Sequence, residues 1–290
     1  MLAYRHAYHA GNHADVLKHV TQTAVLRYMN RKDKPYRVID SHAGAGLYAL
    51  DSAQALKTSE FVDGIARLWN RDDLPEPVAD YLALVKKFNR DAGFPDVVEP
   101  KVYPGSPAFS GELLRARDEL HLFEKHPADY ALIEQFVAGD ARVELRNADG
   151  FAGVVRRLPP PCRRAVVLID PSYEGLADYD KTAACVEDAL GNFAEAVILV
   201  WYPIVENKPA SSQLPEVLKT IAASAPKGWL DARLTVDEPD AHGFGMTGSG
   251  MFVVNPPFTL KAELESVLPY LTKVLAKFSG ASFSLTGESH

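Results

Sequence analysis

A short apolar run, Ala165–Ile169, is followed directly by Asp170, Pro171, Ser172 and Tyr173. The run is too short for a helix and is rich in β-branched residues, so it predicts a buried strand. Ligands of open α/β sheets bind outside the carboxyl ends of the strands. There Asp170 would supply a charged acceptor, Pro171 a backbone carbonyl and Tyr173 a flat ring for stacking. Together these groups suit a planar base that carries an exocyclic amine.

Three more predicted strands also end at a carboxylate. They cover residues 36–40, 119–124 and 142–146, and the acids at or just after their ends are Asp40, Glu124 and Asp149. The carboxyl ends of parallel strands meet at one edge of a sheet, so these acids and Asp170 should line the same edge. One acid in such a place is usually a helix cap, but four of them predict a polar ligand site.

The turn after the first of these strands, Ser41-His42-Ala43-Gly44-Ala45-Gly46, contains two glycines. Glycine permits tight backbone geometry and the close approach of a ligand, as in dinucleotide-binding turns. The spacing is not G-x-G-x-x-G, and no P-loop lysine follows, so a phosphate cradle is disfavoured. A plain turn is the alternative.

Three later strands, at residues 196–201, 229–236 and 249–255, complete a predicted sheet of seven strands. Between the first two strands along the chain, two apolar stripes of helical spacing predict a helical insertion subdomain over residues 51–102. Ser106 before Pro107 has the form of an N-cap with a first-turn proline and predicts a helix to about residue 118. We therefore expect a single α/β domain over residues 1–290, built on a Rossmann-like sheet.

The first 37 residues are basic, although the formal net charge of the whole chain is −7. They contain seven Lys and Arg residues against two Asp residues. Contacts to phosphate dominate the affinity of proteins for nucleic acids, and the distribution of charge decides them more than its sum does. This segment therefore allows a nucleic-acid partner, and a solvated basic helix face is the other interpretation.

The same segment should form an irregular arm and then a helix over residues 13–30, which Asn12 is placed to cap. Four of the chain's histidines lie in it: His6, His9, His13 and His19. A zinc site is an alternative here. It is disfavoured because no cysteine accompanies the histidines and two of them lie in the arm rather than at a helical spacing.

The composition is that of an ordinary globular protein, with 47% hydrophobic and 24% charged residues. The two cysteines, Cys162 and Cys185, form neither a disulfide framework nor a metal quartet, which fits a reducing compartment. No run approaches the length of a membrane span, and the N-terminus lacks the apolar core of a signal peptide. We expect a cytoplasmic monomer with no membrane partner and no metal.

Several blocks of the sequence resemble known proteins. Asp170, Pro171 and Tyr173 match the D-P-P-Y motif of S-adenosylmethionine-dependent amino-methyltransferases, in which the acid and the carbonyl hold the target amine and the ring stacks on the base. Further blocks resemble the RlmJ family and cover residues 4–6, 9–19, 42–46, 104–107 and 148–150. That family consists of bacterial enzymes that methylate N6 of a single adenine in 23S ribosomal RNA.

The resemblance implies a seven-stranded methyltransferase fold, S-adenosylmethionine as cofactor and 23S rRNA as partner. It implies that the cofactor contacts His19, His42, Ser106, Glu124, Asp149, Gly150 and Asp170. The catalytic residues would be Asp170, Pro171 and Tyr173, and the RNA would contact Tyr4, with Arg5, His6 and Lys18 beside it. The chemistry agrees, since Glu124 can accept from ribose hydroxyls, Asp149 from the adenine amine of the cofactor, and basic groups attract its carboxylate.

Two features depart from a simple match. Ser172 stands where the family usually has a second proline, so the loop should be less preorganised. A weaker activity is the most that we expect from this change, since Asp170, Pro171 and Tyr173 remain. A second motif, Asn255-Pro256-Pro257-Phe258, also fits an amino-methyltransferase signature. About thirty residues follow it, reading mainly as one helix, which is too few to finish the sheet, so we expect it to end the seventh strand.

Three other functions remain open from the residues alone. The same site chemistry would serve a DNA adenine methyltransferase, and Ser172 allows a catalytically weak nucleic-acid binding protein on the same fold. A nicotinamide oxidoreductase has only the glycine turn in its favour.

Overall fold

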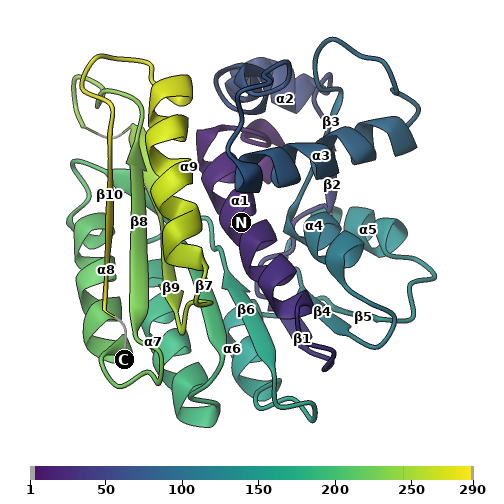
Figure 1. The fold of residues 1–290 in the computed structure, drawn as a ribbon, viewed down its shortest axis with the longest axis vertical. Helices are drawn as coiled ribbons and strands as arrows, with labels where there is room; N and C mark the ends of the chain where they lie inside the picture. Colours follow the sequence, from purple (N-terminus) through teal and green to yellow (C-terminus); the bar gives the residue numbers. More distant parts are fainter. Residues whose placement is uncertain (1–3, 244, 289–290) are drawn as a thin grey trace.

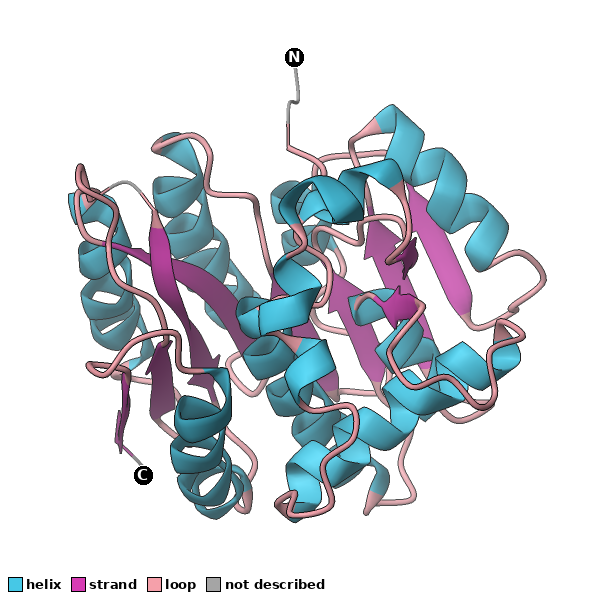
Figure 2. Cartoon of the chain, turned by 90° about the horizontal axis from the view of Figure 1, so that it is seen from above, coloured by secondary structure: helices cyan, strands magenta, loops and turns pink. Residues whose placement is uncertain are grey.

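Residues 4–243 and 245–288 are described by a computed structural model, in which helices cover both faces of one mixed sheet (Figures 1 and 2). The strands of this sheet are β1 (Arg37–Asp40), β4 (Glu119–Phe123), β5 (Val143–Arg146), β6 (Ala165–Ile169), β7 (Val197–Val205), β8 (Trp229–Thr235), β9 (Met246–Val254) and β10 (Ser282–Glu288). Their order is β10-β8-β9-β7-β6-β1-β4-β5.

Five neighbouring strands, β7, β6, β1, β4 and β5, run parallel. β9 is antiparallel to both β7 and β8, and β10 is antiparallel to β8. In the sheet, β1 has β4 on one side and β6 on the other, and the chain crosses from the β4–β5 half to the β6–β7 half after β5. The β1/β6 boundary is therefore a switch point, where ligands of such sheets bind.

The seven strands expected from the sequence are confirmed, but the number seven is wrong, because β10 adds an eighth at the edge of the sheet. Its residues are mostly exposed, and only Leu285 packs against the core. An exposed edge strand needs no buried apolar face, so its sequence carries little of the alternation that marks a strand. For that reason only a helix was expected after Phe258.

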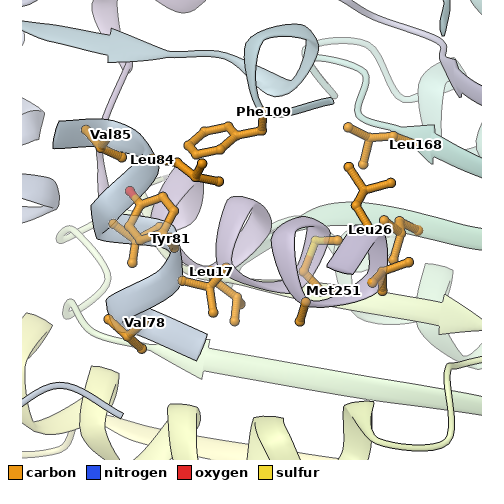
Figure 3. Close-up of a cluster of buried hydrophobic side chains, with 14 of the residues drawn as sticks. Leu17, Leu26, Val78, Tyr81, Leu84, Val85, Phe109, Leu168 and Met251 are labelled. Atoms are coloured by element: carbon orange, nitrogen blue, oxygen red, sulfur yellow. The ribbon is translucent and has the colours of Figure 1, made fainter. Parts of the chain in front are cut away.

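Alternate side chains of the central strands enter two separate cores, as the period of a strand requires. In β6, Val166 and Leu168 join the larger core, whereas Val167 and Ile169 join the core on the other face. Figure 3 shows the larger core, in which Leu168 lies near Leu26 of the N-terminal helix.

The N-terminal helix α1 (His13–Asn30) lies across one face of the sheet (Figure 1). Its predicted cap is confirmed, because the Asn12 side chain accepts from the backbone N–H of Asp15 at 2.9 Å. Almost every residue of α1 is buried, including Lys18 and His19. The helix therefore carries polar groups into the interior, where they must find partners.

Residues 51–102 contain α2 (Ala53–Thr58), the 3-10 turns η2 (Glu60–Asp63) and η3 (Ile65–Arg67), and α3 (Glu76–Asp91). At the base of this segment, β2 (Leu47–Ala49) pairs antiparallel with β3 (Val102–Pro104). The first apolar stripe, at residues 61–69, forms short 3-10 turns rather than the expected helix, and Val62 on it is 51% exposed. The second stripe forms α3, which packs against α1.

The remaining helices are α4 (Ser106–Leu113), α5 (Pro127–Phe136), α6 (Gly150–Arg156), α7 (Ala177–Asn192), α8 (Pro209–Ala222), α9 (Leu260–Leu275) and the 3-10 turn η1 (His6–Tyr8). The capping role expected of Ser106 is wrong: Gly105 is the N-cap, and α4 ends at Leu113 rather than near residue 118. Across the described part of the chain, no helix combines the length and apolarity that a membrane span needs.

Candidate functional site

The four acids of the strand-end pattern lie along one edge of four adjacent strands. Asp40 is the last residue of β1, Glu124 and Asp170 directly follow β4 and β6, and Asp149 follows β5 as the N-cap of α6. These strands are neighbours and parallel, so their carboxyl ends meet. The edge is where the sequence pattern predicted a ligand site.

A cavity opens at this edge. It is lined by all seven residues expected to contact a cofactor: His19, His42, Ser106, Glu124, Asp149, Gly150 and Asp170. Residues from α1, from the glycine turn and from the loops after β4, β5 and β6 thus enclose one space. Their roles toward a ligand stay predictions, but the fold brings all of them together.

The glycine turn forms one wall of this first cavity and is held from two directions. Gly44, at φ 61°, donates its backbone N–H to Glu124 Oε2 at 2.8 Å. On the other side, a Cβ added to Gly150 would lie 1.7 Å from the carbonyl oxygen of Ser41. Only glycine allows α6 to begin this close to the turn.

Asp40, one of the four acids at the strand ends, is buried and does not line the cavity, and it is absent from the cofactor contacts that the family resemblance implies. Its Oδ2 accepts from the hydroxyl of Ser106 at 2.6 Å, and its Oδ1 accepts from the backbone N–H of His42 at 3.1 Å. Burial raises the pKa of Asp40 to about 7, although both hydrogen bonds oppose the shift. Burial also lowers the pKa of His42, to about 4. Ser106 and His42 are therefore tied to one carboxyl group.

A second cavity adjoins the first. Both are lined by Tyr4, His6, Lys18, Asp170 and Ser172. The second is also lined by Tyr173, Trp201, Pro203, Val205, Lys208 and Met246. Two spaces thus meet at the residues that follow β6.

Lys18 joins the two cavities through a buried ion-pair network. Its Nζ lies 2.6 Å from Asp170 Oδ2 and 2.8 Å from Asp15 Oδ1. His6 Nε2 lies 2.8 Å from Asp15 Oδ2, and the hydroxyl of Tyr4 lies 3.0 Å from His6 Nδ1. Burial alone would raise the pKa of Asp15, but His6 and Lys18 hold it well below its usual range. Burial would likewise lower the pKa of Lys18, but Asp15 and Asp170 raise it.

Tyr173 differs from the exposed stacking face that its motif predicts. The ring is only 2% exposed and packs against Tyr179, and its hydroxyl donates to the Trp201 carbonyl oxygen at 2.8 Å. The backbone of Tyr173 has φ 52°, and its carbonyl accepts from Lys208 Nζ at 2.5 Å. These contacts hold the ring in the core rather than in the cavity.

Arg5 is separated from the other residues expected to contact RNA. It pairs with Asp129 at 2.9 Å and lines neither cavity, whereas Tyr4, His6 and Lys18 line both.

The segment before α1 is also tied to the buried ion-pair network, because the backbone N–H of Gly11 donates to Asp15 Oδ2 at 2.8 Å.

The N-terminal histidines have separate partners. His6 contacts Asp15, His9 lies 2.9 Å from Glu60 Oε1, and His19 Nδ1 lies 2.7 Å from the Tyr103 hydroxyl. Within residues 4–243 and 245–288, no three His, Cys, Asp or Glu side chains gather in a group able to hold a metal ion.

The second motif, at Asn255, lies away from the site. β9 is antiparallel to β7 and pairs Val254 with Ile198, so Asn255 follows beside the start of β7, at the opposite edge from Asp170. The Asn255 side chain donates to the carbonyls of Ala194 and Ala196. Its role is structural, as its position in the chain predicted.

Sequence reasoning also missed the wall of the second cavity. Trp201, Pro203 and Val205 lie on the carboxyl half of β7, next to β6 in the sheet. Their signal was available, because the end of a parallel strand beside a motif strand reaches the same edge. They carry no charged side chain, so the pattern of acids did not include them.

The comparisons with known proteins agree along nearly the whole chain. A family model described as "Ribosomal RNA large subunit methyltransferase D, RlmJ" matches residues 33–285. A protein of Escherichia coli (strain K12) named "Ribosomal RNA large subunit methyltransferase J" is 41% identical over 271 residues, which cover 93% of each chain. A protein of the same name from Haemophilus influenzae is 40% identical over 285 residues, which cover 98% of each chain.

A solved structure has the same fold. The crystal structure of protein LPL1258 from Legionella pneumophila matches with a TM-score of 0.84 and 33% identity, over 97% of this chain and 98% of that one. Together with the family model and the two relatives, it confirms the resemblance found in the sequence blocks. This chain therefore belongs to the RlmJ family of ribosomal RNA large subunit methyltransferases.

Proposed function

We propose that this protein transfers a methyl group from S-adenosylmethionine to the exocyclic N6 amine of an adenine in 23S ribosomal RNA. The observation that carries the proposal is the meeting of two cavities at Asp170 and Ser172, in a chain of the RlmJ family. The first cavity would hold the methyl donor, and the second would hold the target base.

The residues of the first cavity fit S-adenosylmethionine. Glu124 offers acceptors for ribose hydroxyls, and Asp149 offers one for the adenine amine. Lys18 and His19 offer donors for the methionine carboxylate, and the ring Nε2 of His19 is buried without a partner among the described residues. When bound, the cofactor supplies a methyl group on a positively charged sulfur, which is open to attack by a nucleophile.

The second cavity fits a planar base. Trp201 contributes an aromatic wall that is more exposed than Tyr173, and Pro203 and Met246 add apolar surface. An adenine in RNA must leave its stack to reach such a cavity, and stacking on an aromatic ring returns about 1–3 kcal/mol. Stacking on Tyr173 itself would need its ring to leave Tyr179 and the hydrogen bond to the Trp201 carbonyl.

Asp170 is the proposed catalytic acceptor. Lys18 holds its Oδ2, while its Oδ1 has no hydrogen-bond partner in the described ranges. Bonds from the target amine to Asp170 and to the Pro171 carbonyl would favour a pyramidal nitrogen with a localised lone pair. That gain is realised mainly in the transition state. The Asp170 carboxylate then accepts the proton that the amine releases, directly or through water.

The arm supports contact with RNA. Tyr4 and His6 lie at the junction of the two cavities, and Arg5 would add a charge beside them. We also infer that the protein acts as a monomer, because one chain supplies the walls of both cavities, and in the cytoplasm, where its proposed substrate is made.

Transfer of label from radioactive S-adenosylmethionine tests this function. The substrates are 23S rRNA from cells that lack the modification and a DNA duplex of matched length. Wild-type protein should place N6-methyladenine in the RNA alone. Asp170→Ala should lose at least about 100-fold in rate, as expected when a group acting mainly in the transition state is removed, with cofactor affinity changed little.

The other outcomes point elsewhere. Label in DNA with none in RNA would indicate a DNA adenine methyltransferase. RNA binding without label from any substrate would indicate a binding protein on this fold. Methylation by Asp170→Ala near the wild-type rate would overturn the catalytic assignment.

A further inference from the structure

Three aromatic residues form a buried chain of polar atoms that ends at the first cavity. The hydroxyl of Tyr81 lies 3.0 Å from the hydroxyl of Tyr103, which lies 2.7 Å from His19 Nδ1. Tyr81 and Tyr103 are fully buried, and His19 is 1% exposed. Tyr81 comes from α3, Tyr103 from β3 and His19 from α1, so the chain links residues 51–102 and their base to the cofactor side of the molecule.

Packing holds the three rings in place. The ring of Phe109 lies 4.7 Å from that of His19 and 5.6 Å from that of Tyr81, and it also contacts Tyr103. Figure 3 shows Phe109 facing Tyr81 in the core beside α1. Rings fixed in this way cannot easily turn toward other partners, so the two hydroxyls and His19 Nδ1 must form their hydrogen bonds with one another.

Counting donors decides the direction of the chain. If Tyr81 donates to Tyr103, Tyr103 donates to His19 Nδ1 and every hydroxyl proton has an acceptor. If His19 instead donated from Nδ1, Tyr103 would donate to Tyr81, and the Tyr81 proton would have no acceptor within the described residues. The first direction leaves one donor without a protein partner, the Nε2–H of His19, and His19 lines the first cavity, where a ligand can accept that bond. The second leaves the Tyr81 O–H unpaired in the core, where no ligand can reach it, so the first direction is favoured.

We propose that Tyr103 fixes His19 in the tautomer that carries its proton on Nε2, so that His19 presents a hydrogen-bond donor to the carboxylate of the methyl donor. Tyr103 is then a positioning residue, since it acts through His19. The inference rests on the proposed function only for the identity of that carboxylate. The tautomer itself is a property of the free protein.

Other observations agree with a neutral, donating ring. His19 Nε2 is buried and has no partner among residues 4–243 and 245–288, although the residue lines the first cavity. Burial, aided by the charge on Lys18, holds the pKa of His19 well below its usual range. A neutral imidazole offers either a donor or an acceptor at Nε2, and a carboxylate accepts only from a donor.

Nuclear magnetic resonance of the imidazole nitrogens tests the tautomer without any ligand. In 15N-labelled wild-type protein, His19 Nε2 should show the shift of a protonated nitrogen and Nδ1 that of an unprotonated one, with His19→Gln used to assign the signals. Tyr103→Phe should give a mixture of the two tautomers. Protonation of Nδ1 in the wild-type protein would overturn the proposal.

Calorimetry with two ligands tests the consequence. Tyr103→Phe should bind S-adenosylmethionine about tenfold more weakly, the range of one hydrogen bond to a charged group. Its affinity for decarboxylated S-adenosylmethionine should change by less than about twofold, because that ligand has no carboxylate to accept a hydrogen bond from His19 Nε2. An equal loss for both ligands would mean that Tyr103 acts through packing, which overturns the proposal.

Two matched variants guard the interpretation. Tyr81→Phe removes a hydroxyl from the same cluster but leaves His19 Nδ1 as the remaining acceptor for Tyr103, so the tautomer and the affinity should persist. Tyr36→Phe removes a buried hydroxyl that donates to Asn30 Oδ1, away from the cavity, and should have no effect on binding. A loss in Tyr81→Phe equal to that in Tyr103→Phe would overturn the proposal. If wild-type protein binds neither ligand, the proposed function fails while the tautomer measurement still stands.

Discussion

The ammonium group of Lys18 lies 2.6 Å from a carboxylate oxygen of Asp170, across 152 positions of the sequence. The same group pairs with Asp15, whose side chain is 1% exposed. One buried cation therefore serves both the start of the N-terminal helix and the residue proposed to receive the proton. Removing it should disturb the stability of the protein as well as its chemistry.

We expect Lys18→Met to lower the free energy of unfolding by about 3–5 kcal/mol, because Asp15 would keep a buried charge with His6 as its remaining partner and Asp170 would lose its cation. Urea denaturation measures this. The control is Lys219→Met, which breaks the more exposed pair with Glu216 and should lose less than about 1 kcal/mol. Similar small losses in both variants would mean that Asp15 does not depend on Lys18.

Asp40 should make stability depend on pH. Burial raises its pKa from an ordinary 3.8 to about 7, so the native state keeps a proton that the unfolded state releases. Its contribution to stability is therefore present below about pH 4 and is lost as the pH rises through about 7. Asp40→Asn cannot ionise, so its stability relative to wild type should improve as the pH rises across this window.

Denaturant unfolding of both proteins at intervals of pH, without cofactor, measures that difference. A difference that stays constant would mean that Asp40 is charged in the native state throughout the window. A change in the opposite direction would mean that its hydrogen bonds from Ser106 and His42 outweigh burial.

Gly150→Ala should push α6 away from the glycine turn, because its Cβ would meet the Ser41 carbonyl at 1.7 Å. Overpacking against backbone costs about 1–3 kcal/mol of stability, and affinity for S-adenosylmethionine should fall with it. Gly191→Ala, where a Cβ meets nothing within 4 Å, should be neutral or gain up to about 1 kcal/mol. Thermal unfolding and calorimetry compare the two, and equal behaviour would contradict the close approach.

Ser172→Pro restores the double proline of the motif and should stiffen the loop between the two cavities. A compatible proline contributes about 0.4–1 kcal/mol by reducing backbone freedom, so methyl transfer should rise by up to about fivefold. Single-turnover rates measure the change. Ser172→Ala is the matched variant, because it removes the hydroxyl without adding a ring, and it should leave the rate nearly unchanged. A slower Ser172→Pro enzyme would mean that the native loop needs a conformation that proline forbids.

The sequence predicts the central sheet well because each inner strand is a buried apolar run that stops at an acid. Val166 to Ile169 are almost fully buried, as the unbroken apolar run of a central parallel strand predicts. The acids that follow are placed by topology alone, since parallel neighbours end at one edge. For that reason the expected cofactor residues could be gathered from the sequence.

What could not be predicted depends on contacts between distant segments. Tyr173 is buried because Trp201 and Lys208, on another strand and the loop after it, hold its hydroxyl and its carbonyl. Asp15 looks like an ordinary first-turn acid of a helix, yet it is the partner of His6 and Lys18. Patterns along the chain carry no signal for such pairings, because side-chain partners are chosen only when the elements pack.

The position of α1 also bears on how the protein folds during its synthesis. This helix is synthesised before every strand of the sheet, yet it packs against β9 and α9, which are synthesised after β8. Contacts between segments so far apart form slowly, because a long loop must close before they can be made. A chain stalled on the ribosome before residue 246 should therefore lack two of the elements that hold α1 on the sheet, β9 and α9, and should bind S-adenosylmethionine more weakly than the whole protein. The enzyme would then reach its full affinity for the cofactor only after β9 and α9 have been synthesised.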